Sequence, residues 1–317
     1  EAGKKTYLVN YEHGSSWRNI GGGRPAFSVP EIAEIANQNQ AIFKEIQKQT
    51  NIHYKPIRYV GLAHDDKEYK ALEASLAWSE GYMVDKKDFT KEISPYFNPD
   101  IDTYQAALIT KNCWQATPGR VIEFIRNIAC QNGGMLLENA RLLEVQRTDE
   151  GFMALVYNQN KEFIEFHCEH FVNALGSNAG EFAKQLGVDT GFYPVKHQAF
   201  ITGRLPLLGK DGDALDMIID RRNYKGFSAV YGQQFAHTGQ IIGCASPATD
   251  ASEVVKDLRY NSKAFIEICA EVFRQWIPQL GAVSFQAFWS GYYTEPRYIV
   301  DPDNNLIAGM RGHGFML

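Results

Sequence analysis

The stretch TYLVNYEHGSSWRNIGGGRP, residues 6–25, constrains the fold more than any other part of the chain. It predicts a β-strand that ends at an acid, Glu12, followed by a glycine-rich loop. A carboxylate in that position accepts hydrogen bonds from the ribose hydroxyls of a dinucleotide. The matching phosphate turn G-x-G-x-x-G normally lies about 20 residues earlier, yet only eleven residues precede Glu12. The stretch is therefore either a nucleotide-binding strand without its phosphate loop, or an acidic turn after an edge strand.

Length and charge narrow the class of protein. The chain has 317 residues, enough for a large core and two domains, and its net charge is −5. That charge gives no reason to expect binding to nucleic acid or to an anionic membrane. We expect no transmembrane segment, because no apolar run reaches the roughly 18 residues that a span needs. We also expect no signal peptide, since the first residues lack an apolar region.

The cysteines favour a reduced protein. There are five, and no two of them form a C-x-x-C pair, which disfavours a disulfide framework and a structural zinc site. We therefore expect cysteines that fill the core, no bound metal and a cytoplasmic setting. The residues concerned are Cys113, Cys130, Cys168, Cys244 and Cys269.

Apolar spacing and capping signals predict four helices. They cover residues 28–49, about 117–132, 177–187 and 262–276. Ser28 and Glu31 form a capping box for the first helix, and Thr117 and Pro118 suit the start of the second. Gly187 is expected to end the third. In the second helix one face is formed by Val121, Ile125, Ile128 and Ala129.

Runs rich in β-branched and aromatic residues lie between the helices. FMALVYN and EFIEFHC are expected to pair as a hairpin through residues 158–160, and HFVNAL, residues 170–175, suggests a strand buried on both faces. The fold class is thus α/β and α+β, with one buried parallel sheet and one antiparallel sheet that has a solvent-exposed face.

Two further segments have loop chemistry suited to a flat or charged ligand. FVNALGSNAGEFA, residues 171–183, predicts a strand, a tight turn at Gly176 and a helix, whose start can bind an anion. RGHGFML, residues 311–317, frees the backbone at two glycines, and its amides could stabilise negative charge. Each segment is also compatible with an ordinary turn, and His313 with a general base, a ligand contact or a loop residue.

Taken in order, these pieces resemble the FAD-dependent amino-acid oxidase superfamily, which includes D-amino-acid oxidase, glycine oxidase and sarcosine oxidase. The strand ending at Glu12 with SSWRNIGGG looks like the family's ribose acid and flavin-side loop. FVNALGSNAGEFAKQLG is similar to its strand–turn–helix, and YPVKHQAFIT to its step into the substrate domain. FWSGYYTEP and the closing GHGF resemble its late W-x-G strand and its final flavin contact.

The resemblance implies a FAD-binding Rossmann-like domain, incomplete at both ends, and an antiparallel-sheet substrate domain. The first would comprise residues 1–30, 104–190 and 286–317, and the second residues 31–103 and 191–285. With the phosphate loop missing, the chain as it stands is expected to bind FAD poorly.

The resemblance also assigns residues. The cofactor contacts it implies are Glu12, Ser15, Ser16, Arg18, Asn19, Gly21, Gly22, Leu142, Ala174, Gly176, Gly312, His313, Gly314, Phe315 and Met316. The catalytic or substrate-side candidates are Tyr231, Tyr292, Tyr293, Arg297 and His313.

Two departures from the family pattern refine this expectation. Arg18 stands where covalently flavinylated relatives carry His, and no Cys is near His313, so the FAD is expected to be noncovalent. Tyr293 stands where many members carry a carboxylate-binding Arg, and Arg297 is the nearest replacement.

The implied activity is oxidation of a C–N bond in a small-molecule amine or amino acid, by hydride transfer to flavin N5. Two alternatives stay open. One is a flavin dehydrogenase of a hydroxyl substrate such as glycerol phosphate, for which Arg221, Arg222 and Lys225 are the only phosphate-binding cluster. The other is a flavin-free, non-catalytic fragment. An oligomer is possible.

Overall fold

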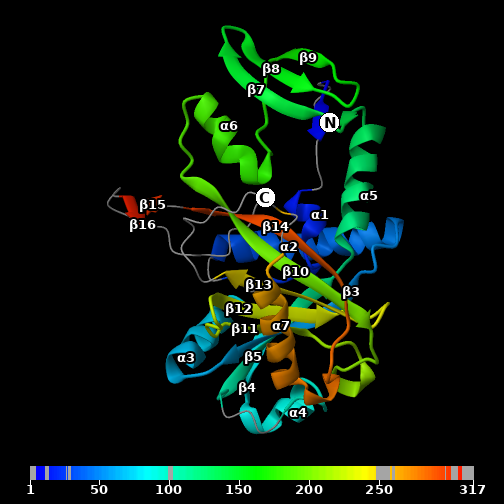
Figure 1. Cartoon of the computed structure of the whole chain (residues 1–317), viewed down its shortest axis with the longest axis vertical. Helices are drawn as coiled ribbons and strands as arrows, with labels where there is room; N and C mark the ends of the chain where they lie inside the picture. The colour runs from blue at the N-terminus through cyan, green and yellow to red at the C-terminus, as the bar shows by residue number, and fades with distance from the viewer. Residues whose placement is uncertain are drawn as a thin grey trace. The chain divides into compact units, whose positions relative to one another are not determined.

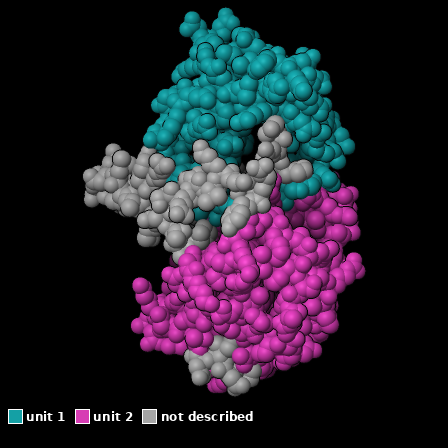
Figure 2. Space-filling view, viewed as in Figure 1, with its two compact units in different colours: residues 1–17, 122–196, 292–317 teal, residues 18–121, 197–291 magenta. Residues whose placement is uncertain are grey.

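A computed structural model describes residues 5–10, 14–25, 27, 30–98, 103–247, 258, 261–296, 298–300 and 306–308. The chain divides into two compact units (Figure 2). Unit 1 comprises residues 1–17, 122–196 and 292–317, and unit 2 residues 18–121 and 197–291. Residues 18–30, 104–121 and 286–291, expected in the FAD-binding domain, cluster with unit 2, and residues 191–196, expected in the substrate domain, cluster with unit 1.

Unit 1 contains three small sheets, one of which is the strand pair of residues 298–300 and 306–308, and two of the longer helices (Figure 1). Strand β1 pairs in parallel with β6, while β7, β8 and β9 form an antiparallel meander that includes the predicted hairpin. The strands are β1 Tyr7–Asn10, β6 Met135–Glu138, β7 Arg141–Thr148, β8 Gly151–Tyr157 and β9 Phe163–Cys168. The helices are α5 Pro118–Gln131, which begins in unit 2, and α6 Ala179–Gln185.

The expected parallel sheet with two buried faces is not found in the described part of unit 1. Its only parallel pair there is β1–β6, in which Tyr7 and Leu8 are 44% and 46% exposed. Residues 170–175 form no strand, and Val172 is 83% exposed. Phe171 and Leu175 instead pack against the unit's apolar cluster, so alternate side chains of an extended segment are covered. An apolar run alone could not distinguish these two outcomes.

Helix α5 shows a similar difference between pattern and burial. It begins at Pro118 as predicted and ends before Gly133, whose φ is 90°. Of its apolar face Val121 is buried, whereas Ile125 and Ile128 are 55% and 37% exposed. Val121 is the buried residue of α5, so only the first turn of the predicted apolar face is covered by described residues.

A mixed nine-stranded sheet dominates unit 2. Its order is β14-β10-β13-β12-β11-β3-β5-β2, with β4 also on β5, and β11–β3 is the parallel pair among antiparallel neighbours. The strands are β2 Gly22–Gly23, β3 Lys55–Ala63, β4 Gly81–Asp85, β5 Ala106–Gln115, β10 Phe192–Arg204, β11 Met217–Asp220, β12 Phe227–Gln234, β13 Gln240–Pro247 and β14 Phe285–Pro296. Strands β10 and β14 each continue into unit 1, and β15 Tyr298–Val300 pairs with β16 Leu306–Ala308.

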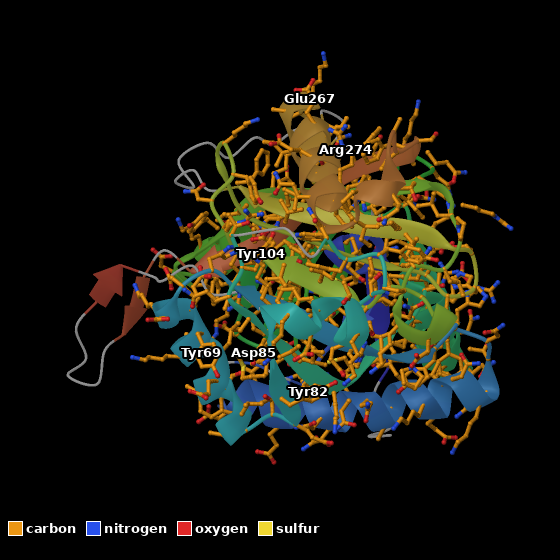
Figure 3. The ribbon with its side chains drawn as sticks, turned by 90° about the horizontal axis from the view of Figure 1, so that it is seen from below. Tyr69, Tyr82, Asp85, Tyr104, Glu267 and Arg274 are labelled. Carbon is orange, nitrogen blue, oxygen red and sulfur yellow. The ribbon has the colours of Figure 1, made fainter. Side chains whose placement is uncertain are left out.

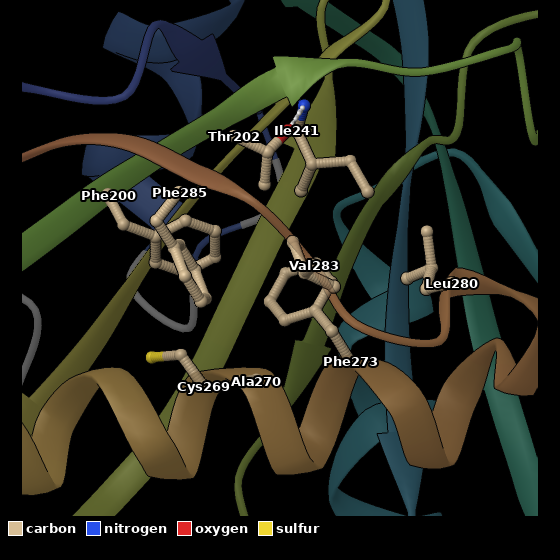
Figure 4. A pocket seen from close by; sticks show the side chains of 9 residues that line it. All are labelled: Phe200, Thr202, Ile241, Cys269, Ala270, Phe273, Leu280, Val283 and Phe285. Atoms are coloured by element: carbon tan, nitrogen blue, oxygen red, sulfur yellow. Dashed lines mark hydrogen bonds between the residues drawn. The ribbon is translucent and has the colours of Figure 1, made fainter.

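Helix α7, Lys263–Trp276, covers one face of this sheet, as its predicted amphipathic pattern requires. Phe265, Phe273 and Trp276 are at most 2% exposed. Figure 4 shows Phe273 and Cys269 from α7 facing Phe200 of the sheet across a small apolar gap. The other helices are α1 Ser15–Arg18, α2 Pro30–Gln49, α3 Asp66–Ala74 and α4 Phe89–Glu92. Short 3-10 turns are η1 Ser75–Ala77, η2 Lys86–Asp88, η3 Gly176–Asn178, η4 Lys210–Gly212 and η5 Pro278–Leu280.

The side chains of strand β11 alternate between the two faces of the sheet. Ile218 belongs to the core under α7, whereas Met217 and Ile219 point to the opposite face. There they join a second cluster, here called the loop-facing cluster. Its members are Ile20, Ile57, Tyr59, Cys113, Met217, Ile219 and Tyr231.

All five cysteines are free, which confirms the absence of a disulfide framework. Three fill the core as expected, and burial raises the pKa of the Cys244 thiol to about 12. Cys130 is exposed, so for it the expectation was wrong. The described residues hold no side-chain group suited to a metal ion, and none of their helices is both long and apolar enough to span a bilayer.

A stacked histidine pair joins two loops of unit 2. The rings of His53 and His237 lie 3.9 Å apart and nearly parallel, and His53 Nδ1 is 2.9 Å from Thr117 Oγ1. Burial and the charge of Arg120 lower the pKa of His53. Burial, His53 and Arg120 lower the pKa of His237. The neutral rings are therefore favoured in the folded state.

A lowered pKa of histidine in the folded state means that stability is complete above the unfolded value of about 6.5 and falls as the pH drops below it. We expect the free energy of unfolding to decrease between pH 7.5 and 5.5, and to decrease less in His237→Gln. Urea unfolding at both pH values measures this. An identical pH dependence in the variant and the natural chain would contradict the assignment.

Candidate functional site

The glycine-rich loop lies against the sheet of unit 2. The O of Gly21 accepts the backbone N–H of Ala116 at 2.9 Å, and β2 pairs antiparallel with β5. A Cβ on Gly21, whose φ is 74°, would lie 2.3 Å from the Ala116 carbonyl oxygen. A Cβ on Gly22 would lie 2.3 Å from the Tyr59 hydroxyl. The close backbone approach that the glycines allow is thus made to this sheet.

Side chains fix the same loop from two directions. Gln233, fully buried on β12, donates from Nε2 to the Ile20 carbonyl at 2.8 Å. Asn19 Oδ1 accepts the Gly21 N–H at 2.7 Å, so this side-chain oxygen shapes the turn. Because Ile20 and Tyr231 pack in the same loop-facing cluster, the structure brings the loop and one predicted catalytic residue onto one face.

Two hydrogen bonds join Arg18 to the late W-x-G strand. Arg18 Nη1 donates to the Ser290 carbonyl at 3.1 Å, and Trp289 Nε1 donates to the Arg18 carbonyl at 2.6 Å. A Cβ on Gly291 would already touch the Arg18 side chain, at 3.4 Å. Two motifs more than 270 residues apart in sequence therefore form one assembly in unit 2.

In unit 1 the predicted residues lie on several separate segments. The Ser15 hydroxyl donates to the Tyr292 carbonyl at 2.5 Å, and Ser16 is exposed. Tyr293 lies half-buried on β14. Leu142 is 8% exposed inside the unit's apolar cluster, which leaves its backbone rather than its side chain for a ligand.

The turn after residue 173 keeps an accessible backbone. Ala174 is exposed, and Gly176 has a φ of 55° at the start of η3. Asn173 Nδ2 donates to the Ala179 carbonyl at 2.8 Å, which ties the turn to α6. Helix α6 ends as predicted at Gly187, whose φ is 79°. The turn therefore leaves a backbone of small residues accessible.

Several predicted residues lie outside the described residues. They are Glu12, Arg297, Gly312, His313, Gly314, Phe315 and Met316.

A buried polar network was not predicted from the sequence. Asp220, fully buried at the end of β11, accepts His64 Nε2 at 2.9 Å, the Tyr104 hydroxyl at 2.5 Å and Arg222 Nη2 at 2.8 Å. Trp276 Nε1 donates to the Tyr104 hydroxyl at 3.0 Å. Tyr104 lies in the interior of the molecule (Figure 3). His64 and Tyr104 are 156 and 116 residues away from Asp220 in sequence, so no local pattern links them to it.

Arg222 and Lys225 of the predicted cluster Arg221, Arg222 and Lys225 are bound to different acidic residues. The side chain of Arg222 is bound to Asp220, and Lys225 pairs with Glu271 at 3.1 Å. The three cations therefore do not converge on one phosphate, as the hydroxyl-substrate alternative required.

Several known proteins are similar to this chain. The family model described as FAD dependent oxidoreductase matches residues 6–317. Among solved structures, L-proline dehydrogenase from P. horikoshii is similar at a TM-score of 0.75 and 21% identity, over 97% of this chain and 82% of that one. Glycine oxidase from Geobacillus kaustophilus is similar at 0.74 and 16%, over 96% and 82%. L-α-glycerophosphate oxidase from Mycoplasma pneumoniae, with FAD bound, is similar at 0.71 and 17%, also over 96% and 82%. No curated protein matches the chain.

Proposed function

Because the chain belongs to the FAD-dependent oxidoreductase family, we propose that it oxidises a C–N bond of a small amine or amino acid. The observation that carries the proposal is the assembly of Arg18 with Trp289 and Gly291, which joins the flavin-side loop to the W-x-G strand. Two of the similar structures are a proline dehydrogenase and a glycine oxidase, enzymes that are named for amino acids.

The cofactor is FAD, and we assign the following residues of unit 1 to it. In unit 1, Glu12 would accept the ribose hydroxyls, the Leu142 backbone would meet the adenine, and Ala174 and Gly176 would border the dinucleotide. Ser15 and Ser16 supply hydroxyls at the loop. The segment Gly312–Met316 would offer backbone amides to the flavin ring, and such donors stabilise negative charge.

When bound, FAD supplies the hydride acceptor, and the protein supplies position and electrostatics. Tyr231, on the loop-facing cluster, and Tyr293 and Arg297 are the residues we assign to the substrate. Their task would be to hold the substrate C–H within about 3–3.5 Å of its acceptor. His313 would hold or accept a proton. Arg18, held by the Ser290 carbonyl, offers no nucleophile for a covalent flavin link, which supports noncovalent binding.

A hydroxyl substrate is the second candidate, because the glycerophosphate oxidase is also similar in fold. The pairing of Arg222 with Asp220 and of Lys225 with Glu271 argues against it, since it leaves one of the three expected cations for a phosphate.

Turnover with an electron-accepting dye tests the choice of substrate. FAD-loaded protein should reduce the dye with proline, glycine or sarcosine and not with glycerol 3-phosphate. Turnover of glycerol 3-phosphate alone would overturn the proposal. Protein that retains no flavin after reconstitution would favour the non-catalytic fragment.

A further inference from the structure

Two buried glutamines connect the glycine-rich loop to the sheet of unit 2. Gln115 ends β5, where it is the register neighbour of Gly22, and Gln233 lies on β12 two residues after Tyr231. Neither glutamine is exposed to solvent. Burying an amide group is costly unless its polar atoms are hydrogen-bonded. The partners of these two side chains therefore indicate what the side chains do.

The two amide groups form a relay that begins at the turn between β12 and β13. Gln115 Oε1 accepts the Ala236 backbone N–H at 3.0 Å, and Gln115 Nε2 donates to the Gln234 carbonyl at 3.1 Å. Gln115 Nε2 also lies 3.5 Å from Gln233 Oε1, and Gln233 Nε2 donates to the Ile20 carbonyl at 2.8 Å. Two side chains thus join this turn to the glycine-rich loop.

The backbone groups at both ends of the relay fix the orientation of its amides. The Ala236 N–H can only donate and the Ile20 carbonyl can only accept. The oxygen of the Gln115 amide must therefore face Ala236, and the nitrogen of the Gln233 amide must face Ile20. Methionine at position 233 would fill a similar space without a donor, so this position separates the hydrogen bond from the packing.

The Gln233 amide fixes the loop on the face of the sheet that carries Tyr231. Side chains two residues apart on a strand share one face, and Ile20 packs with Tyr231 in the loop-facing cluster. A second attachment of the loop uses only backbone, because the Gly21 carbonyl accepts the Ala116 N–H at 2.9 Å. The place of the loop beside Tyr231 therefore depends on the side chain at position 233.

We propose that Gln233, oriented by Gln115, is a positioning residue that holds the flavin-side loop beside Tyr231 and so supports the binding of FAD. This inference rests on the proposed function, because the flavin contacts of the loop are assigned there. Gln233 acts through the loop and does not itself contact the substrate.

Hydrogen exchange of the Ala116 amide tests the attachment of the loop without FAD. This N–H is bonded to the Gly21 carbonyl, so its exchange rate reports how often the loop leaves β5. Gln233→Met removes the donor to the Ile20 carbonyl. We expect the Ala116 amide to exchange about tenfold faster in this variant, and FAD, titrated by the quenching of its fluorescence, to bind about tenfold more weakly.

Gln234→Met is the matched control. Gln234 is also fully buried on β12, but its Nε2 donates to the carbonyls of Pro206 and Gly239, both at 2.8 Å, and not to the glycine-rich loop. This variant should unfold at a lower urea concentration than the natural chain. It should nevertheless keep the natural FAD affinity and the natural exchange rate at Ala116.

Gln240→Met replaces this control if Gln234→Met does not fold, since Gln240 Nε2 donates to the Thr202 carbonyl at 2.9 Å. A natural exchange rate at Ala116 in Gln233→Met would overturn the proposal. So would an equal loss of FAD affinity in Gln233→Met and the control, or no FAD binding by the natural chain. Failure of amine turnover would overturn the proposed function and leave the exchange rates and the FAD affinities interpretable.

Discussion

Replacement of Asp220 by alanine is expected to lower the free energy of unfolding by about 3–5 kcal/mol. The carboxylate is fully buried and accepts hydrogen bonds from His64, Tyr104 and Arg222. Its removal leaves the Arg222 guanidinium, 18% exposed at its side chain, without a counter-charge. Urea denaturation of the variant and the natural chain measures the difference.

Asp85→Ala is the control for this variant. Asp85 pairs with Lys87 at 3.7 Å, and both side chains are at least 70% exposed, so the expected loss is about 0–1 kcal/mol. Equal losses in the two variants would show that the Asp220 network does not stabilise the fold.

The same network predicts a response to acid. Burial alone raises the pKa of Asp220, but hydrogen bonds from His64 and Tyr104 and the charge of Arg222 lower it overall. A lowered carboxyl pKa contributes stability above the unfolded value of about 3.9, and that stability is lost as the pH falls through the folded value. Natural protein should therefore lose stability below about pH 4 more steeply than Asp220→Ala.

Gly21→Ala is the second change with a large expected effect. The new methyl group would meet the Ala116 carbonyl at 2.3 Å, and the residue would be forced to keep a φ of 74°. We expect the loop to leave β5, at a cost about 1–3 kcal/mol above that of positive φ alone. The variant should also retain less FAD, because the resemblance assigns flavin contacts to residues of this loop.

Gly226→Ala separates the two contributions. Its φ is 94°, yet nothing lies within 4 Å of its Cβ position, so it should lose only the about 1–2 kcal/mol of the strained backbone. Thermal or urea unfolding of both variants measures the two losses of stability. A loss in Gly226→Ala that matches Gly21→Ala would contradict a packing role for Gly21.

Local signals predicted α2, α5, α6 and α7, whereas α1, α3 and α4 were not predicted. The start of α5 at Pro118, the end of α6 at Gly187 and the buried stripe of α7 all depend on a few neighbouring residues. Such signals act over one or two turns, where caps and φ preferences decide the outcome.

Burial was harder to predict, because it depends on what packs above an element. Residues 170–175 and the face of α5 carry apolar side chains that the described residues cover only in part. The glycine triplet was read as a ligand loop, whereas its Cβ positions are filled by Ala116, Tyr59 and Trp114.

The candidate site was predicted only where a motif marks it. Arg18 and the W-x-G strand were both singled out, but nothing local indicated that they bind each other. The sequence did not predict the hydrogen bonds of Asp220 with His64 and Tyr104, because these contacts depend on strand register across the sheet. The assignments of Glu12, Arg297 and residues 312–316 remain predictions.

The central claim is that the chain uses FAD to oxidise an amine. The direct measurement is anaerobic mixing of FAD-loaded protein with an amino acid, followed at the flavin band near about 450 nm. We expect bleaching with an amino acid or amine such as proline, glycine or sarcosine, no bleaching with glycerol 3-phosphate, and a carbonyl compound together with the released amine as products. A flavin that stays oxidised with every amine, and is bleached by glycerol 3-phosphate, would contradict it.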